Sequence, residues 1–273
     1  MSWRPSIGGT LPLRRAAAAS RLPTARPADH PSGMSLERWA HAVSAPVAHR
    51  LWAWLRWAGG IGPQHRLGRR FSSFGDGSLI CFPPGDNLGE EHIAIGRASL
   101  VAPNVTMSVG MAPGQPLPTG ATSPVLRIGD RCLIGRGSHL VAHRAVTIGD
   151  DVITGPGCYV TDQNHTYADP GTPIGAQWPS EDPVVIGAGS WLGAGAVILP
   201  GTRLGSNTVV GAGAVVRGTF PDHAVLAGIP AAVVRRWSPD EGWQPALRDV
   251  LIDAPPGWPD AGGGRSPAAP GAG

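Results

Sequence analysis

The 273-residue sequence predicts an all-β chain, a parallel β-helix of short stacked strands, with an amphipathic helical segment before it. Two observations predict the strands: an aliphatic residue returns every six positions, and glycine usually follows it. The 40 glycines and 29 prolines exceed the average usage of ~7% and ~5%. Because 42% of the residues are also hydrophobic, we interpret the glycines as turns between strands rather than as a sign of disorder.

The repeat unit is an aliphatic residue, then usually glycine, two variable residues, a small residue and one more. Units begin at Ile128, Ile134, Leu140, Ile148, Thr154, Val160, Ile186, Leu192, Ile198, Leu204, Val210 and Val216, with an earlier copy at Ile95 and Val101. One unit makes a short strand and a tight turn, and three units close a triangular coil. Stacked coils pair each strand with its neighbours about 4.8 Å away. The later units therefore predict four coils, and the earlier copy allows one more.

The segment 35–60 is predicted to be helical. Apolar residues recur at intervals of three and four from Leu36 to Ala58, the spacing of an amphipathic helix. Pro46 lies inside this pattern and predicts two short helices or a kink near Ala45. We favour a helix packed on the rest of the protein. The alternative is a helix on a membrane surface, since arginines and tryptophans could lie at the interface.

The remaining boundaries follow from composition. Residues 1–34 are expected to be a disordered tail or a mis-assigned start, and residues 71–237 to be the β-helix domain. Within that domain, the stretch from Val109 to Pro124 is dense in Pro and Gly and is predicted to be a loop. Residues 238–273, rich in Pro, Gly and Ala, are expected to be mostly disordered.

Charge and cysteine usage exclude some classes of function. All 22 basic residues are Arg, and they are dispersed through the repeats, which argues against nucleic-acid binding. The apolar runs fall short of the ~18 residues that suggest a membrane span. Cys81, Cys132 and Cys158 lack the spacing of a metal site. We expect them to be reduced and structural, which favours a cytoplasmic location.

Four segments carry a family resemblance: the loop Thr161–His165, and the segments Ser190–Ala196, Val210–Val216 and Ala227–Arg235. They resemble hexapeptide-repeat acyltransferases of the maltose and galactoside O-acetyltransferase type, and the resemblance covers about residues 90–237. It implies a left-handed coil and a homotrimer with active sites between subunits. It also implies direct transfer of an acetyl group from acetyl-CoA to a hydroxyl of a sugar or glycan, without a metal.

The chemistry of this reaction needs a base, because a hydroxyl that attacks a thioester must lose its proton. Histidine, with a reference pKa of about 6.5, suits this task near neutral pH. His165 lies in an excursion, Asp162 to Ile186, that interrupts the repeats, and its place matches the family's catalytic histidine. The resemblance further implies that the Ala194 backbone N–H stabilises the oxyanion. Asn164 is a candidate for orienting the ring or the acceptor, and Asp162 and His143 are candidates for binding the acceptor.

The slot for coenzyme A is expected along the last coils. The resemblance implies as donor-binding residues Trp191, Gly193, Ala194, Gly211, Ala212, Gly213, Arg217 and Arg235. The two arginines match family positions that contact the phosphates, whereas Ala232 stands where Lys or Arg is common. Trp191 is expected either to pack on the pantetheine or to fill the subunit interface.

Two other functions are weighed against this prediction. A γ-carbonic-anhydrase-like metalloenzyme would use His139, His143 and His165, but His143 lies in a two-residue insertion that gives a zinc triad poor geometry. A non-catalytic β-helix scaffold subunit would keep the coil and lose the activity. The sequence leaves the acceptor open between a sugar, a glycolipid, an antibiotic and an amine.

Overall fold

The computed structural model of the chain describes residues 36–112, 117–118 and 120–246. Contacts divide the chain after residue 48 into two units, and the division falls inside helix α1 (Leu36–Ala58). The tail expected at 1–34, and residues 247–273 of the tail expected at 238–273, lie outside the described residues. The β-helix belongs to the unit that begins at residue 49.

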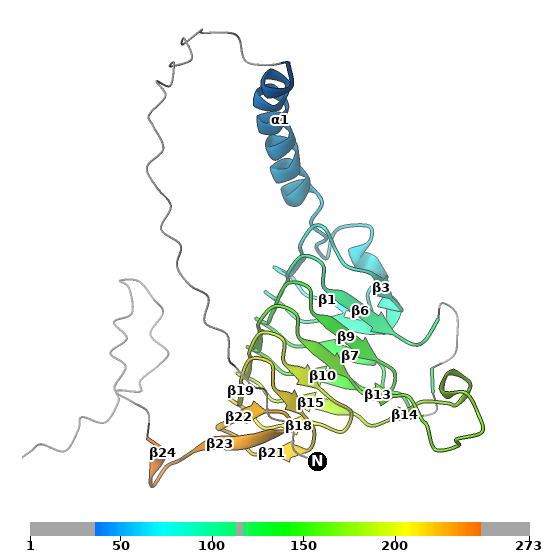
Figure 1. Cartoon of the computed structure of the whole chain (residues 1–273), viewed down its shortest axis with the longest axis vertical. Coiled ribbons are helices and arrows are strands. Elements are labelled where there is room, and N and C mark those ends of the chain that lie inside the picture. The colour runs from blue at the N-terminus through cyan, green and yellow to red at the C-terminus, as the bar shows by residue number, and fades with distance from the viewer. Residues whose placement is uncertain (1–35, 113–116, 119, 247–273) are drawn as a thin grey trace, which may run out of the picture. The chain divides into compact units, whose positions relative to one another are not determined.

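Short strands stack into three sheets that face one another as a triangular prism (Figure 1). Sheet I contains β1 (Ser73–Phe74), β4 (Ile93–Ile95), β7 (Leu126–Ile128), β10 (Val146–Ile148), β15 (Val184–Ile186), β18 (Arg203–Leu204) and β21 (Thr219–Phe220). Sheet II contains β2 (Leu79–Ile80), β5 (Leu100–Val101), β8 (Leu133–Ile134), β11 (Ile153–Thr154), β16 (Trp191–Leu192), β19 (Val209–Val210), β22 (Ala224–Gly228), β23 (Ala231–Ser238) and β24 (Gly242–Gln244). Sheet III contains β3 (Asn87–Leu88), β6 (Thr106–Val109), β9 (His139–Ala142), β12 (Tyr159–Thr161), β17 (Val197–Ile198) and β20 (Val215–Val216).

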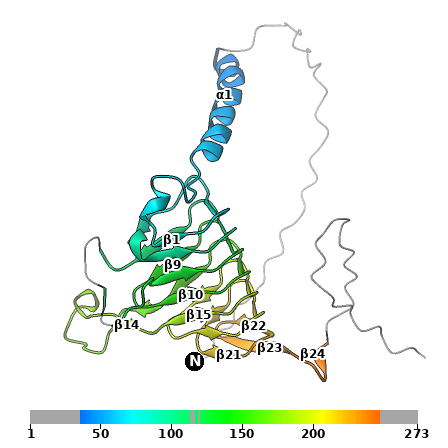
Figure 2. The same ribbon diagram turned by 180° about the vertical axis from the view of Figure 1, so that it is seen from behind.

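The chain visits sheets I, II and III in turn, and each visit to the three makes one coil (Figure 2). Neighbouring strands are parallel, except that β22, β23 and β24 are antiparallel. The fold is therefore a parallel β-helix, as predicted. Its turns define three edges of the prism, which we call the I/II, II/III and III/I edges.

The predicted number of coils is confirmed after residue 127 and is too low before it. Strands β7 to β12 and β15 to β20 make the four predicted coils, but two coils precede them in the described residues. The first of these, β1 to β3, escapes the repeat pattern because Phe74 fills the aliphatic position. Asn87 then opens its third strand with a polar residue.

The core is the stack of aliphatic first positions, which are almost completely buried, as at Ile134, Leu140 and Ile198. Small polar residues fill the corners, where Thr208 Oγ1 donates to the Gly205 carbonyl at 2.8 Å. The glycine after the aliphatic residue permits stacking: a Cβ on Gly193 would lie 2.5 Å from the Ala212 nitrogen of the next coil. Since no side chain fits there, the repeat demands glycine for close packing of the coils.

Ion pairs link adjacent coils along the I/II edge. Arg97 bonds Asp130 at 3.1 Å, and Arg131 bonds Asp151 at 2.6 Å, each pair linking two adjacent coils. The hydrogen bond from the Arg131 side chain lowers the pKa of Asp151 below its ordinary value. Hydrogen bonds from the Arg97 backbone and then from its side chain do the same for the pKa of Asp130.

Helix α1 runs through Pro46 as a single element, so the prediction of two short helices is wrong. For residues 49–58 the prediction that it packs on the rest of the protein is confirmed on one side only, where Trp52 contacts Phe82. Of these residues only Leu55 is partly buried; the others are exposed. Trp52 alone makes an aromatic contact, edge-on to Phe82 with ring centroids 6.0 Å apart. Among the described residues, no helix is both long and apolar enough to cross a membrane.

Two other boundaries are adjusted. Strand β23 ends at Ser238 and is followed by β24, so the ordered domain continues past the predicted limit at residue 237. The predicted loop from Val109 to Pro124 carries no strand in its described part, after β6 ends. Three short 3-10 helices complete the fold: η1 (Gly68–Arg70), η2 (Glu90–His92) and η3 (Ile174–Ala176).

Candidate active site on two edges of the prism

The predicted excursion leaves the coil at the III/I edge, between β12 and β15. Its two arms form a small antiparallel ribbon, β13 (Gln163–Asn164) and β14 (Ser180–Glu181), which projects from the prism (Figure 1). Asn164 ends β13, His165 follows directly, and both are exposed. At the tip, Asp169 accepts hydrogen bonds from the Thr172 hydroxyl at 2.6 Å and the Gly171 N–H at 2.9 Å. These bonds lower its pKa, the Thr172 bond most. The ribbon thus presents His165 on an organised loop.

Asp162 holds the base of the excursion. It is fully buried, and its Oδ1 accepts the His143 N–H at 2.8 Å. Its Oδ2 accepts the N–H groups of Arg144 at 2.8 Å and Ala145 at 2.6 Å. The predicted acceptor contact is therefore corrected: both oxygens of Asp162 are used inside the protein, where they fix the turn from β9 to β10.

His143 lies beneath the other arm of the ribbon. It is 2% exposed, and its Nδ1 shares a hydrogen bond of 2.6 Å with Glu181 Oε1. Its ring faces Trp178, with centroids 5.8 Å apart. In a single chain this side chain is covered rather than open to an acceptor. Sequence reasoning missed Glu181 because its partner is 38 residues away and nothing local signals the pair.

A cavity of about 280 Å³ opens at the same edge. It is lined by Asn164, Ser180, Glu181, Asp182, Leu199, Pro200 and Arg217. The structure thus brings Arg217, predicted to bind the donor, together with Asn164 of the excursion. His165 is next in sequence to this lining but is not part of it.

The II/III edge carries the other predicted residues. Trp191 stands outward on β16 with 53% of its surface exposed, and Ala194 lies exposed in the turn that follows. The Ala194 N–H donates no hydrogen bond within the described residues. Ala212 occupies the equivalent exposed position one coil further on.

Gly211 and Gly213 lie in the turn of the next coil and differ in their surroundings. A Cβ on Gly211 would lie 3.2 Å from the Leu226 carbonyl oxygen, so this glycine serves coil packing. Gly213 has φ +68° and open space beyond it. Gly195, one coil earlier, is the same, with φ +67° and open space. These glycines leave a bare strip of backbone along the edge.

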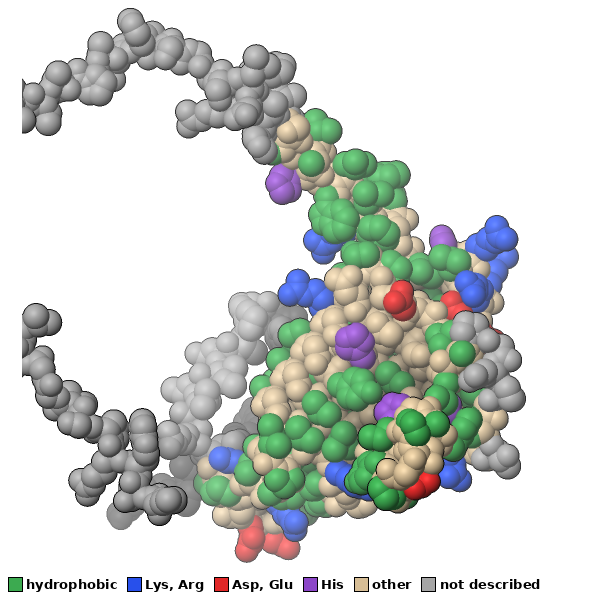
Figure 3. Space-filling model, turned by 45° about the vertical axis from the view of Figure 1, so that its right-hand side comes forward, with side chains coloured by type: hydrophobic (Ala, Val, Ile, Leu, Met, Phe, Trp, Pro, Cys, Tyr) green, Lys and Arg blue, Asp and Glu red, His purple; other side chains and the backbone are tan. Residues whose placement is uncertain are grey.

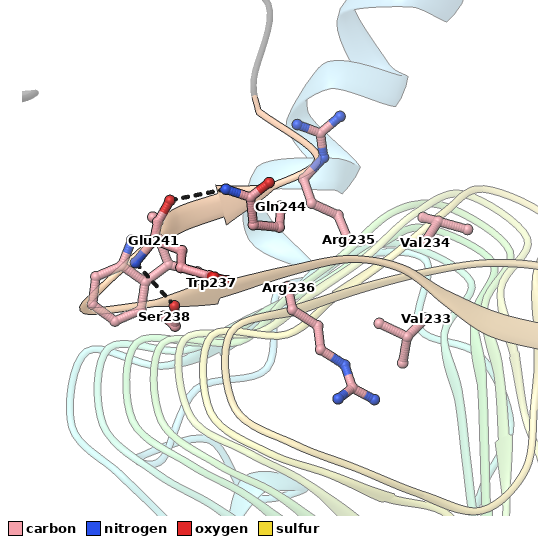
Figure 4. Close-up of a pocket in the computed structure, with 9 residues that line it drawn as sticks. Val233, Val234, Arg235, Arg236, Trp237, Ser238, Glu241 and Gln244 are labelled. Atoms are coloured by element: carbon pink, nitrogen blue, oxygen red, sulfur yellow. Dashed lines mark hydrogen bonds between the residues drawn. The ribbon is translucent and has the colours of Figure 1, made fainter. Parts of the chain in front are cut away.

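The chain leaves the coil through β23, where Arg235 pairs with Val225 of β22. Arg235 and Arg236 point to opposite sides of the strand (Figure 4). The Arg235 Nη1 is buried without a hydrogen-bond partner among the described residues. A cavity of about 500 Å³ lies here, lined by residues 233–238, 241, 242 and 244. A buried guanidinium nitrogen without an acceptor is costly, and an anion would satisfy it.

Sheet III separates the two edges. Four strand residues at about 3.3 Å each place its edges roughly 13 Å apart. A base and an oxyanion donor must both lie near one reacting carbon, about 3 Å from the groups they serve. One chain therefore brings Asn164, His165 and Arg217 to one edge and leaves Trp191 and Ala194 at another.

The histidines of the metal alternative do not converge in one chain. His139 points outward from β9, whereas His143 is buried and paired with Glu181. Across residues 36–112, 117–118 and 120–246, no group of three or more His, Cys, Asp or Glu side chains could hold a metal ion.

Comparison with family models matches the coils on both sides of the excursion. Residues 125–162 match the hexapeptide repeat of succinyl-transferase, and residues 183–218 match the bacterial transferase hexapeptide of six repeats. The excursion with His165 lies between these two matches.

Two curated relatives align with the same region. A probable acetyltransferase of Mycobacterium tuberculosis is 35% identical over 132 residues, 47% of this chain and 44% of that protein. The galactoside O-acetyltransferase of Lactococcus lactis is 36% identical over 97 residues, 36% of this chain and 46% of that protein. The chain thus spans about half the length of the curated relatives it matches.

Among solved structures, the D94A mutant of AntD, an N-acyltransferase from Bacillus cereus, has a similar fold. The TM-score is 0.52 with 16% identity, over 66% of this chain and 94% of that one. The solved structure shows the fold, and the repeat matches show hexapeptide repeats of bacterial transferases on both sides of the excursion. The chain is similar to hexapeptide-repeat acetyltransferases, galactoside O-acetyltransferases among them.

Proposed function

We propose that the protein is a CoA-dependent O-acetyltransferase that moves an acetyl group from acetyl-CoA to a hydroxyl of a sugar or glycan. The observation that carries this proposal is the interruption of the repeats by an organised ribbon that presents His165 beside the polar cavity with Asn164 and Arg217. The names of its relatives support the acyl group and the sugar, since two of them are galactoside O-acetyltransferases.

In the proposed reaction His165 is the general base. Its imidazole takes the hydroxyl proton of the acceptor as the oxygen bonds to the thioester carbon, and the carbonyl oxygen becomes negative. The free Ala194 N–H donates a hydrogen bond to that oxyanion. The tetrahedral intermediate then collapses, the C–S bond breaks, and His165 returns its proton to the departing sulfur. No covalent enzyme intermediate is needed, so both substrates are bound at once.

The donor lies on the second edge in this proposal. The bare strip at Gly213 lets the thin pantetheine arm approach the coil, and Trp191 flanks it. The phosphates contact Arg235, whose buried Nη1 lacks a partner in the described residues, and Arg217, which the III/I edge of the next copy supplies. Gly193 and Gly211 serve the stacking of the coils beneath this strip.

The acceptor lies on the first edge. Asn164 lines the cavity with Glu181 and offers an amide to sugar hydroxyls or to the His165 ring. His143 and Asp162 act beneath the surface as positioning residues, the first through Glu181 and the second through the turn at 143–145.

The separation of the two edges supports assembly into a homotrimer. A complete site forms when the III/I edge of one copy meets the II/III edge of the next, and a ring of three copies closes such head-to-tail contacts. An outward apolar column on sheet II offers a surface to bury between copies: Leu79, Leu100, Leu133, Ile153, Trp191, Val209 and Val225. The left-handed sense of the coil belongs to the same proposal.

Cytoplasmic location is also part of the proposal, because acetyl-CoA is the donor and the three cysteines are free thiols. Peripheral membrane contact through residues 36–58 is a separate proposal.

The experiment is a thiol-release assay with acetyl-CoA and a panel of sugars, glycolipids and amines. The proposal expects release that depends on a sugar hydroxyl and yields an O-acetyl ester by mass spectrometry. Transfer to amines alone, or no transfer at all with stoichiometric zinc in the purified protein, would overturn it.

A further inference from the structure

The C-terminal half of helix α1 leaves large apolar side chains in water. Leu51, Trp54 and Trp57 are 54%, 56% and 81% exposed. Figure 3 shows hydrophobic side chains over much of this helix. Burial of such side chains against an apolar partner is favourable, because it removes apolar surface from water. Their exposure therefore points to an interaction partner that covers them.

Leu51 and Trp54 lie on one side of the helix, with Arg50. Positions 50 and 54, and 51 and 54, are separated by the three or four residues that bring helical side chains together. Trp52 and Leu55 lie toward another side, where Trp52 meets Phe82. Trp57 lies between the two sides, because it lines a cavity with Cys81 and Phe82 although it is 81% exposed. The helix thus has one side that contacts the β-helix and one, with Arg50, Leu51 and Trp54, that is free.

The neighbourhood of this free side is strongly cationic. Residues 38–75 contain six of the 22 basic residues of the chain and none of the 19 acidic ones. Arg50, Arg66 and Arg69 are exposed and form no ion pair within the described residues. Arg70 pairs with Glu90 at 3.3 Å. Although the whole chain carries only +3, this segment carries +6 and leaves the rest acidic.

We propose that residues 49–70 form a docking surface for an anionic lipid bilayer. Leu51, Trp54 and Trp57 enter the interface, where amphipathic indole rings are favoured, and the arginines meet lipid phosphates. The charge selects this occupant over a second copy of the chain, because residues 49–70 contain five arginines and no acidic residue, and two such segments repel each other. The helix lies on the membrane, as no described helix is long and apolar enough to cross it.

This surface is independent of the proposed acetyl transfer, so each can fail without the other. The experiment is sedimentation of the full chain with vesicles of phosphatidylglycerol mixed with phosphatidylcholine, and with vesicles of phosphatidylcholine alone. We expect binding to the anionic vesicles, weakened by salt. The substitutions Arg50→Gln, Arg66→Gln and Arg69→Gln should each weaken it roughly fivefold, about 1 kcal/mol per basic residue.

The apolar side is tested with Leu51→Ser, Trp54→Ser and Trp57→Ser combined, which should lower vesicle binding at least roughly tenfold. The matched control is Tyr167→Ser with Ile174→Ser, since these residues are 74% and 53% exposed on the excursion. The control should bind like the parent. Circular dichroism checks that each variant keeps its strands.

Three results would overturn the proposal. The parent could bind neither kind of vesicle. It could bind both equally, without response to the arginine substitutions. In the third result, the parent protein binds neither kind of vesicle, and the triple serine variant has a lower particle mass than the parent in light scattering. This result would assign the surface to contact with a second copy of the chain.

Discussion

The III/I and II/III edges of the prism are built by opposite means. The III/I edge receives the connections 110–125, 143–145 and 162–183, and its shape depends on individual side chains such as Asp162, which fixes three backbone N–H groups. The II/III edge repeats one tight turn in each coil, and at Gly195 and Gly213 its backbone is not covered by side chains. An irregular edge can supply a base and select an acceptor. A regular edge can supply a backbone N–H for the oxyanion and a flat backbone surface for the pantetheine arm of the donor. The two edges are therefore complementary halves of one proposed site.

The largest effect is expected from the irregular edge at His165. Replacing His165 with Ala should lower acetyl transfer by roughly 10²–10⁴-fold, the usual contribution of a general base. Thiol release measures it, with the assembly mass unchanged by light scattering. The control is His139→Ala, also an exposed histidine, which should keep activity near the parent's. A variant that lacks His165 but turns over normally would remove the base from the proposal.

The anchor of that edge should dominate stability. Asp162→Ala leaves three N–H groups without their acceptor, those of His143 and Ala145 buried and that of Arg144 partly buried. Since each such loss costs about 1–3 kcal/mol, we expect the free energy of unfolding to fall by about 3–5 kcal/mol. Urea denaturation measures it against Asp182→Ala, whose carboxylate is exposed. Equal stabilities of the two variants would contradict the anchoring role.

A substitution in β23, where the chain leaves the coil, tests the proposed binding of the acetyl-CoA phosphates. Arg235→Gln removes the charge beside the buried, unpaired nitrogen. A charged hydrogen bond to phosphate is worth about 1.5–3 kcal/mol, so KM for acetyl-CoA should rise roughly tenfold or more while kcat changes little. Arg236→Gln, on the opposite side of β23 (Figure 4), is the matched control and should leave KM unchanged. If KM for acetyl-CoA rose in Arg236→Gln and stayed unchanged in Arg235→Gln, the phosphate contact would belong to Arg236.

The smallest effect is expected at the I/II edge, which takes no part in the site. At this edge the hydrogen bond from Arg131 lowers the pKa of Asp151 below its ordinary value of 3.8. The ionised Asp151 therefore stabilises the folded protein at a pH above 3.8. This stabilisation is lost as the pH falls through the lowered pKa. Because the pair with Arg131 is exposed, Asp151→Asn should cost less than about 1 kcal/mol at neutral pH. Thermal melts should show a gap between variant and parent that closes in acid. A gap that widens in acid would contradict the assignment.

The difference between the edges also explains what the sequence could predict. The regular edge is local: the period of six fixes Gly193, because coil stacking excludes a Cβ there, and the four coils after residue 127 are confirmed. The irregular edge depends on contacts between distant residues, such as His143 with Glu181. The sequence therefore located the excursion but misjudged Asp162, whose burial depends on a turn 17 residues earlier.

The central claim is that a complete site takes one edge from each of two copies, and mixed assemblies test it directly. Ala194→Pro removes the predicted oxyanion N–H, and the fold tolerates it because Pro103 and Pro156 occupy turns at this edge. Alone, Ala194→Pro and His165→Ala should each be nearly inactive. Co-expressed with two tags and purified as mixed trimers, they should regain about a third of the parent's activity, because one of the three sites in each mixed trimer has both intact halves. Mixed trimers no more active than either variant alone would contradict a site shared between copies.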